Sequence, residues 1–232
     1  MPWVMFDYGA VICTPQPADD LAALAAAAGA GVAEFQAAYW ASRRAYDAAA
    51  LTTAAYWQDV AGRLGASFTS PQIADLIRLD VASWGHLRED TVRLIRDLRR
   101  EGRRLALLSN APGELARAVA GLPVATCFEH LLFSCDLGVA KPDPRCFGRA
   151  LGRLGAAPEE VILIDDREEN VIAATGLGMH AIRFTGPEQA RAALTGIFAT
   201  GGSYSVEGNT PPSWILAVQK LSVRSERCWR VS

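Results

Sequence analysis

The 232-residue sequence has little cysteine, and the distribution of its five cysteines excludes two kinds of site. Their number is odd and no two form a CxxC pair, so neither a disulfide framework nor a zinc site is expected. No apolar run approaches the roughly 20 residues that a membrane helix needs. The amino terminus also lacks the segments of a signal peptide. We therefore expect a cytoplasmic protein.

An excess of charge of either sign is also missing. The chain has 23 Lys and Arg against 25 Asp and Glu, which gives a formal net charge of −2. Such a balance provides no electrostatic reason to bind nucleic acid or an anionic membrane. The three histidines stand apart without metal-ligand spacing, so none is assigned a catalytic role. A small-molecule partner is expected instead, with the chain acting as a monomer or homodimer.

Three apolar segments of the chain run into polar or acidic residues. The first runs from Trp3 into Asp7, the second ends on Ser109-Asn110, and the third ends on Asp165-Asp166. Short apolar runs of this kind are typical of buried strands in a parallel sheet. Helices are expected over 89–100, 114–120, 145–154, 169–176 and 187–198, and two further strands over 130–134 and 181–184. This alternation predicts the α/β fold class, with a doubly wound parallel sheet.

The segment between the first and second strands has a different pattern. From Ala18 to about Asp90 there are helix signals and no strand signal, with aromatic residues at helical spacing. Roughly four helices are expected, over 21–28, 32–48, 52–64 and 70–84, the last with Ser70 as N-cap. We therefore predict an α/β core over 1–14 and 88–200, a helical bundle over 15–87, and a poorly ordered tail over 201–232.

The ends of parallel strands meet at one edge of a sheet, so this fold brings Asp7, Ser109-Asn110 and Asp165-Asp166 together, with Lys141 in a nearby loop. A carboxylate in such a place can attack phosphorus and hold the phosphoryl group covalently. Clustered carboxylates repel one another unless a cation lies among them, and oxygen ligands suit Mg²⁺. The hydroxyl and backbone N–H groups near Ser109 can hold phosphate oxygens. The set predicts Mg²⁺-dependent chemistry on a small phosphorylated metabolite.

At these residues the sequence resembles the haloacid dehalogenase superfamily, and specifically its phosphatases with a helical cap inserted after the first strand. The match covers about 3–186 and rests on four motifs: FDYGAV from Phe6, LLSN from Leu107, Lys141-Pro142, and IDDREEN from Ile164. The resemblance implies a Rossmann-like core, a lid over the site and the following roles. The catalytic residues are Asp7 and Lys141. Phosphate is bound by Ser109, Asn110 and Lys141. The metal is bound by Asp7, Asp166 and the Gly9 carbonyl, and its shell is supported by Asp165 and Asn170.

One position departs from the phosphatase pattern. The family usually has a second aspartate, a general acid and base, two residues after the nucleophile, where this chain has Gly9. Loss of a positioned proton donor typically lowers the rate by on the order of 10²–10⁴. The chain is then a slow phosphatase, or acts on a leaving group that needs little protonation, such as the anomeric hydroxyl of a sugar 1-phosphate. A subgroup that resembles α-glucose-1-phosphate phosphatases has glycine here, which favours sugar phosphates.

Two other functions compete with the phosphatase. A 2-haloacid dehalogenase would use Asp7 against carbon without metal, but Asp165-Asp166 would then raise the pKa of the nucleophile and weaken it. A protein that binds phosphometabolites or a partner without turnover is also compatible with Gly9.

Arg43, Arg44 and Tyr46 of the cap are possible substrate contacts. The competing interpretation of these three residues is a solvated helix face.

Overall fold

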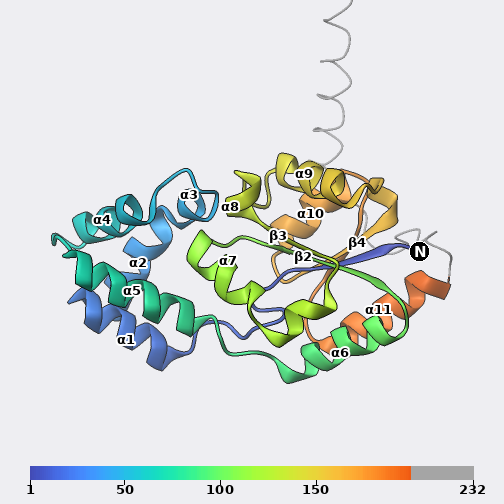
Figure 1. Cartoon of the computed structure of the whole chain (residues 1–232), viewed down its shortest axis with the longest axis horizontal. Helices are drawn as coiled ribbons and strands as arrows, with labels where there is room; N and C mark the ends of the chain where they lie inside the picture. Colours follow the sequence, from blue (N-terminus) through green and yellow to red (C-terminus); the bar gives the residue numbers. More distant parts are fainter. Residues whose placement is uncertain (200–232) are drawn as a thin grey trace, which may run out of the picture. The chain divides into compact units, whose positions relative to one another are not determined.

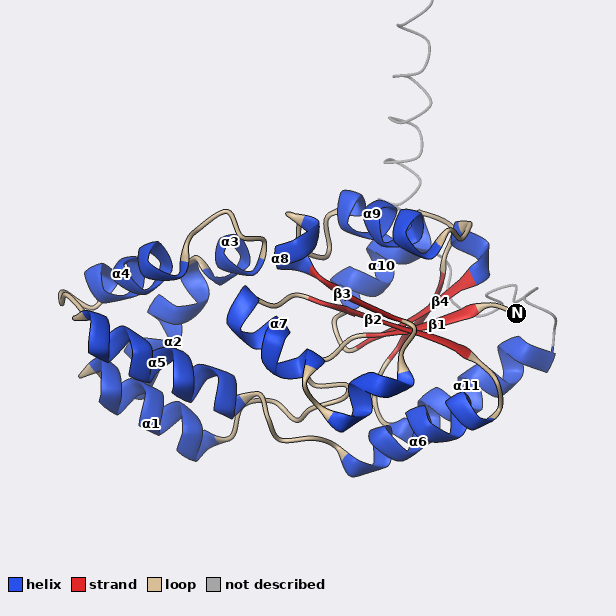
Figure 2. Cartoon of the chain, in the orientation of Figure 1, coloured by secondary structure: helices blue, strands red, loops and turns tan. Residues whose placement is uncertain are grey.

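The computed structural model describes residues 1–199, and within them the chain forms a five-stranded parallel sheet flanked by helices (Figures 1 and 2). The strand order is β3-β2-β1-β4-β5, so the first strand lies in the centre. The strands are β1 (Trp3–Phe6), β2 (Arg104–Ser109), β3 (His130–Phe133), β4 (Val161–Asp165) and β5 (His180–Arg183). This is the predicted α/β architecture, with each strand starting and ending within a few residues of its expected position.

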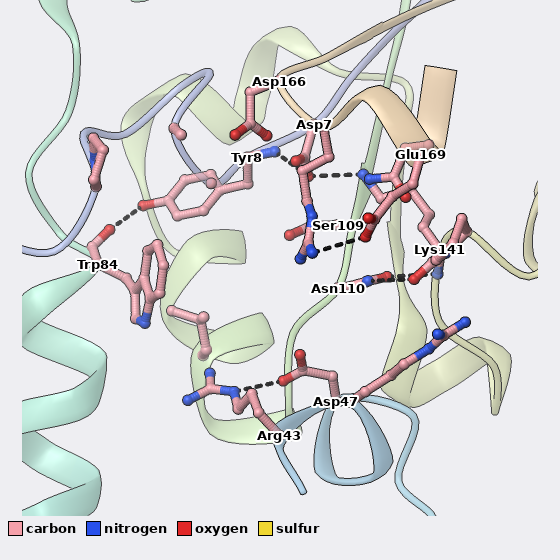
Figure 3. A pocket seen from close by; sticks show the side chains of 18 of the residues that line it. Asp7, Tyr8, Arg43, Asp47, Trp84, Ser109, Asn110, Lys141, Asp166 and Glu169 are labelled. Carbon is pink, nitrogen blue, oxygen red and sulfur yellow. Dashed lines mark hydrogen bonds and ion pairs between the residues drawn. The ribbon is translucent and has the colours of Figure 1, made fainter. Parts of the chain in front are cut away.

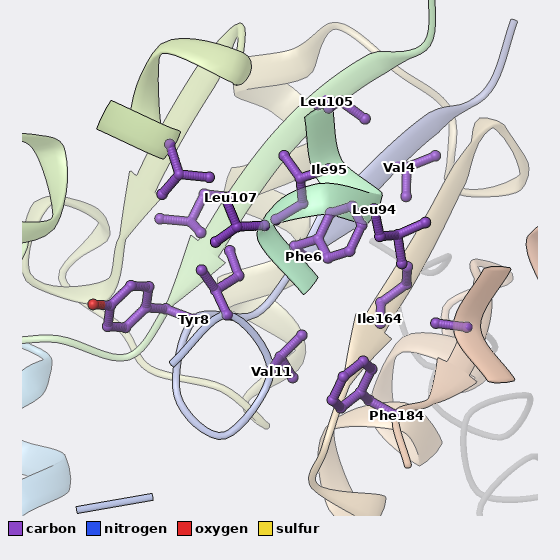
Figure 4. Packing of buried hydrophobic residues seen from close by; sticks show 14 of the residues in the cluster. Val4, Phe6, Tyr8, Val11, Leu94, Ile95, Leu105, Leu107, Ile164 and Phe184 are labelled. Carbon is purple, nitrogen blue, oxygen red and sulfur yellow. The ribbon is translucent and has the colours of Figure 1, made fainter. Parts of the chain in front are cut away.

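Alternation along the central strands sends side chains into two separate hydrophobic layers. On β1, Val4 and Phe6 face one layer, whereas Trp3 and Met5 face the other. The first layer lies under α6 (Glu89–Arg100), α7 (Gly113–Ala120) and α11 (Pro187–Ala199), and part of it is drawn in Figure 4. The second lies under α9 (Pro144–Leu154) and α10 (Glu168–Gly176). A strand covered on both faces must be apolar throughout, which explains the runs seen in the sequence.

Five helices lie between β1 and α6 along the chain, where about four were expected. They are α1 (Ala18–Ala28), α2 (Val32–Ala41), α3 (Arg43–Asp47), α4 (Thr53–Arg63) and α5 (Ser70–Ser83). They bury a third hydrophobic cluster of their own, built around Phe35, Tyr39 and Trp57. The expectation that the aromatic residues of this segment form a bundle core is confirmed for these three. Trp40 is an exception, since 48% of it is exposed.

The two connections between this helical unit and the sheet lie side by side. The backbone N–H of Thr14 donates to the carbonyl of His86 at 2.8 Å, and the N–H of Arg88 donates to the carbonyl of Ile12 at 2.8 Å. Between them, Cys13 and Leu87 form an antiparallel bridge. The chain therefore leaves and re-enters the α/β part through one short paired ribbon.

Several local expectations are corrected by the structure. The helix expected over 32–48 is broken at Ser42, whose hydroxyl donates to a carboxylate oxygen of Asp59 at 2.6 Å. The N-cap of α5 is Thr69 and not Ser70, because the Thr69 hydroxyl accepts a hydrogen bond from the backbone N–H of Gln72. Three short helices were not predicted, since one turn carries too little pattern: η1 (Pro123–Cys127), α8 (Ser134–Leu137) and η2 (Pro158–Glu160).

Two further expectations concern membranes and the tail. Among residues 1–199, no single helix has the length and apolar character to cross a membrane, although the bent pair of α1 and α2 meets both requirements together. The tail predicted over 201–232 lies outside the described residues.

The central sheet predicts a large effect of one core truncation. Leu163 on β4 is fully buried between the sheet and its covering helices. We expect Leu163→Ala to lower the free energy of unfolding by about 2–5 kcal/mol in urea denaturation, because it removes buried methyl groups and leaves a cavity. The matched control is Val32→Ala on the exposed start of α2, with an expected change within about 0.5 kcal/mol. Equal effects of the two variants would contradict the assignment of the core.

Candidate active site

The carboxyl ends of the central strands open into a cavity of about 460 Å³, shown from close by in Figure 3. Asp7 follows β1 directly, and its backbone N–H donates to the carbonyl of Ile164 on β4 at 2.9 Å. Ser109 ends β2, and Asp166 follows the last residue of β4. The sheet therefore brings these three residues to one edge, because the parallel register of β1 aligns its end with those of both neighbours.

Lys141 ties two of these strand ends together. Its Nζ lies 2.9 Å from Oδ1 of Asp7 and 2.6 Å from Oδ2 of Asp165, and all three side chains are buried. Burial alone would lower the pKa of Lys141, but the charges of Asp165 and Asp7 outweigh it and raise that pKa. The amine therefore stays charged at any physiological pH.

The pKa of the Asp7 carboxyl lies near neutral pH. Burial raises its pKa to about 7, against the lowering effect of Lys141 and with a further increase from Asp165 and Asp166. A carboxyl with a raised folded-state pKa binds more protons when folded than when unfolded. Its contribution to stability is therefore lost as the pH rises from about 4 to about 7.

Asp165 and Asp166 are neighbours in sequence but have different surroundings. Both oxygens of Asp165 are engaged, by Nζ of Lys141, by Nδ2 of Asn170 and by the backbone N–H of Arg167. The carboxylate of Asp166 is half-buried and accepts no hydrogen bond from residues 1–199. Burial, followed by the charge of Asp165, raises the pKa of Asp166. Asp165 is thus a positioning group, and Asp166 is available to a ligand.

The oxygens of these side chains have the arrangement that a divalent cation requires. One carboxylate oxygen each from Asp7, Asp165 and Asp166 lie within 4.8 Å of one another. The buried Oδ1 of Asn170 has no hydrogen-bond partner within residues 1–199, which leaves it free to accept from a metal-bound water. Clustered carboxylate oxygens of this kind are the ligands that Mg²⁺ prefers, with water completing its coordination.

The residues expected to bind phosphate divide into two kinds. Ser109 is buried beside Asp7 and lines the cavity. The side-chain amide of Asn110 is instead paired with the backbone of Lys141, donating to its carbonyl at 2.9 Å and accepting from its N–H at 2.8 Å. Asn110 therefore holds the loop that delivers the Lys141 side chain.

Of the three expected contacts on the helical unit, two line the cavity. Arg43 and Arg44 lie on its wall, but Tyr46 does not. Tyr46 is buried, and its hydroxyl donates to Glu114 of α7 at 2.9 Å. Arg43 does not lie on a solvated helix face, because its guanidinium is buried. Its Nε lies 2.8 Å from Oδ1 of Asp47, and its Nη1 lies 2.9 Å from Oδ2 of Asp80.

Several residues at the cavity were not singled out from the sequence. The most informative is Asp47, which follows Arg43 by four residues and lines the cavity. Burial, moderated by Arg43, raises the pKa of its carboxyl. In the sequence, the only indication of a role for Asp47 was its position four residues after Arg43, a spacing at which two helical side chains can pair. Trp40 and Trp84 also line the cavity, and their aromatic character alone could not separate them from the core residues.

Gly9 leaves room beside the nucleophile. A Cβ built at this position would lie 3.6 Å from Cζ3 of Trp84, an ordinary van der Waals distance. The Trp84 carbonyl accepts a hydrogen bond from the Tyr8 hydroxyl at 2.7 Å, which fixes this aromatic wall (Figure 3). The structure therefore has space for a Cβ at the position where the resemblance implies an acid.

Comparison with known proteins shows the family to which the chain belongs. The family model described as haloacid dehalogenase-like hydrolase matches residues 6–178, three quarters of the chain. The chain belongs to the haloacid dehalogenase-like hydrolases. As a member of that family it is a hydrolase, and its sheet and helices have the family's α/β fold.

Relatives of this haloacid dehalogenase-like hydrolase include phosphatases. A phosphoserine phosphatase from Thermus thermophilus is 39% identical over 88 residues, 37% of this chain and 35% of that protein. The mouse haloacid dehalogenase-like hydrolase domain-containing protein 3 is 30% identical over 60% of this chain and 59% of its own length. The chain thus spans less than two thirds of these relatives.

One solved structure shows the shared fold. A HAD family enzyme from Bacteroides thetaiotaomicron, in complex with magnesium and inorganic phosphate, is 21% identical with a TM-score of 0.62. The alignment covers 78% of this chain and 93% of that enzyme.

The Lys141 bridge predicts a pH-dependent loss of stability on its removal. Lys141→Met leaves the buried carboxylates of Asp7 and Asp165 without their cation, and we expect the free energy of unfolding at pH 8 to fall by about 3–5 kcal/mol. The loss should be smaller at pH 5.5, because Asp7 then takes up a proton. The measurement is urea denaturation at both pH values.

The control for this variant is Arg78→Met, which removes an exposed ion pair with Asp75. Little change is expected there at either pH. A Lys141→Met loss that is the same at pH 5.5 and pH 8 would show that the bridge does not control the charge of Asp7.

Proposed function

We propose that this hydrolase is a Mg²⁺-dependent phosphomonoesterase that acts through an aspartyl-phosphate on a small phosphorylated metabolite. The proposal rests mainly on one observation: Asp7, Lys141 and Asp166 come together at the carboxyl edge of the sheet and line one cavity. Phosphatases among the relatives support it. So does a structural neighbour with magnesium and phosphate.

In the first half-reaction, a carboxylate oxygen of Asp7 forms a bond to phosphorus while the bond from phosphorus to the ester oxygen breaks. The leaving oxygen takes a proton from solvent, since Gly9 offers none. In the second half-reaction, water attacks the phosphorus of the aspartyl-phosphate, releases inorganic phosphate and restores the Asp7 carboxylate. The raised pKa of Asp7 is compatible with this role once positive charge in the site ionises the carboxyl.

The surrounding residues have separate tasks in this mechanism. Lys141 orients Asp7 and offsets the charge of the incoming phosphate, and the Ser109 hydroxyl donates to a phosphate oxygen. Asp7, Asp166 and the Gly9 carbonyl would hold Mg²⁺, which supplies charge neutralisation when bound. Asp165 and Asn170 keep Lys141 and the metal ligands in place.

The helical unit over 15–87 acts in this proposal as a cap that covers the site and limits its exposure to bulk water. Its residues Trp40 and Arg43 share the cavity with Asp7. Because Gly9 cannot protonate a leaving group, the favoured substrates have a weakly basic leaving oxygen, and sugar phosphates esterified at an anomeric hydroxyl have this property.

The proposal predicts Mg²⁺-dependent release of inorganic phosphate. Purified protein should hydrolyse p-nitrophenyl phosphate and members of a sugar phosphate panel, and EDTA should abolish turnover. Asp7→Asn should lower kcat by at least about 10³, since it removes the nucleophile. Turnover that persists in Asp7→Asn would refute the nucleophile assignment.

Two control measurements separate the competing functions. If the protein binds phosphate esters but neither hydrolyses them nor becomes phosphorylated, the result would favour a binding module. Release of chloride from 2-chloropropionate in the presence of EDTA would favour a dehalogenase.

Restoring the missing acid provides a second prediction. Gly9→Asp adds a carboxyl two residues after the nucleophile, where a Cβ makes only an ordinary van der Waals contact, and we expect kcat for alkyl phosphates to rise about 10-fold or more. Gly9→Asn is the matched control, because it has the same size but cannot exchange a proton. An equal gain with both variants would mean that the effect is steric, and no gain would mean that leaving-group departure does not limit turnover.

A further inference from the structure

A carboxylate on the cap faces the cavity from the side opposite the nucleophile. Asp47 is the last residue of α3 and is only 7% exposed. In Figure 3 its side chain lies across the view from Asp7, with Ser109 and Asn110 between them. Its Oδ1 accepts a hydrogen bond from Nε of Arg43 at 2.8 Å, whereas its Oδ2 accepts none from residues 1–199. One oxygen is therefore left for a ligand in the cavity.

Asp47 is held in place by the core as well as by its own helix. Its backbone carbonyl accepts a hydrogen bond from the hydroxyl of Ser134 at 2.5 Å. The same hydroxyl accepts from the backbone N–H of Ala111 at 2.9 Å, just after the phosphate-binding segment. Because these bonds join α3 to the loop beside Ser109, the Asp47 carboxylate has a defined position relative to the phosphate end of the cavity.

The charges around Asp47 limit which group its free oxygen can bind. The guanidinium of Arg43 also reaches both oxygens of the buried Asp80, and the Tyr39 hydroxyl donates to that carboxylate. Arg44 lies on the same wall, and the charge of Arg167 also acts on Asp47. A ligand cation at Oδ2 would thus lie close to resident guanidinium groups, while an anion would face a poorly solvated carboxylate.

The cavity offers apolar surface between its two charged ends. Tyr8 and Trp84 lie along one side, and Leu115 also lines the cavity (Figure 3). A leaving group with a carbon skeleton can pack there while its phosphate lies at Asp7. Asp47 lines the same cavity, on the helical unit that faces such a skeleton.

We propose that Asp47 determines substrate specificity by accepting a hydrogen bond from a neutral hydroxyl at the far end of the leaving group, and that it disfavours leaving groups that end in an anion. This inference rests on the proposed phosphatase function. It assigns the substrate to the class of polyhydroxylated monophosphates without a second anionic group. Asp47 touches the part of the substrate that does not react, so it is a specificity residue and takes no part in the chemistry.

Three esters that differ at one carbon test the inference. Glucose 1-phosphate carries a hydroxyl at C6, glucuronate 1-phosphate carries a carboxylate there, and 6-amino-6-deoxyglucose 1-phosphate carries an ammonium, while all three have the anomeric leaving oxygen that the proposed function favours. For the wild-type protein with Mg²⁺, kcat/KM should favour the hydroxyl over the carboxylate by at least about tenfold, because like charges in an interface repel strongly. The ammonium ester should also be poorer than the hydroxyl ester.

Asp47→Asn is the informative variant, since its amide keeps the shape, loses the charge and can donate to a carboxylate. We expect the ratio of hydroxyl to carboxylate ester to fall to about one, mainly through KM. The matched control is Asp80→Asn, which removes the other carboxylate bound by Arg43 but does not line the cavity. This control should change all three esters by a similar factor.

The outcomes separate the two proposals. If p-nitrophenyl phosphate is hydrolysed but the wild-type protein accepts glucuronate 1-phosphate as well as glucose 1-phosphate, the role of Asp47 is wrong and the phosphatase stands. A preference for the ammonium ester, or an unchanged ratio in Asp47→Asn, would also overturn it. The wild-type ratios decide the question even if the variant fails to fold. No hydrolysis of any ester would defeat both proposals.

Discussion

One buried ammonium group holds the site of this protein together. Lys141 belongs to neither β1 nor β4, yet its amine bonds to the carboxylate that follows the first strand and to the one that ends the other. Buried charges of this kind are tolerated only when they are paired. The pairing fixes the direction of Asp7, and through Asn110 it also fixes the loop from which Lys141 extends. Removal of any one member leaves the others with an uncompensated charge or an unsatisfied polar group.

The sequence allowed the edge of the sheet to be predicted well because the rule involved is simple. A parallel strand covered on both faces has to be apolar, and the first polar residue after it marks the open end. This rule located Asp7, Ser109 and Asp165, and the structure brings all three to the same edge. The division of labour between Asp165 and Asp166 followed less easily, because it depends on which carboxylate is nearer Lys141 and Asn170.

The helical unit was predictable as a bundle but not as a wall of the cavity. Helical spacing shows which residues are apolar, and Phe35, Tyr39 and Trp57 are indeed buried together. It does not show where a helix breaks, and the break at Ser42 is what sets the direction of α3 and so of Arg43 and Asp47. The partner of Arg43 that completes the network, Asp80, lies 37 positions further along the chain. A contact at that separation leaves no trace in a local pattern.

The paired ribbon at Cys13 and Leu87 has a consequence for how such proteins diversify. Because the chain enters and leaves the helical unit at adjacent points, the ends of the insertion stay a few ångströms apart whatever lies between them. A different insertion can replace this one without any change in strand order or in the residues at the sheet edge. The side chains at the sheet edge and those that the insertion contributes to the cavity can therefore change independently over evolutionary time.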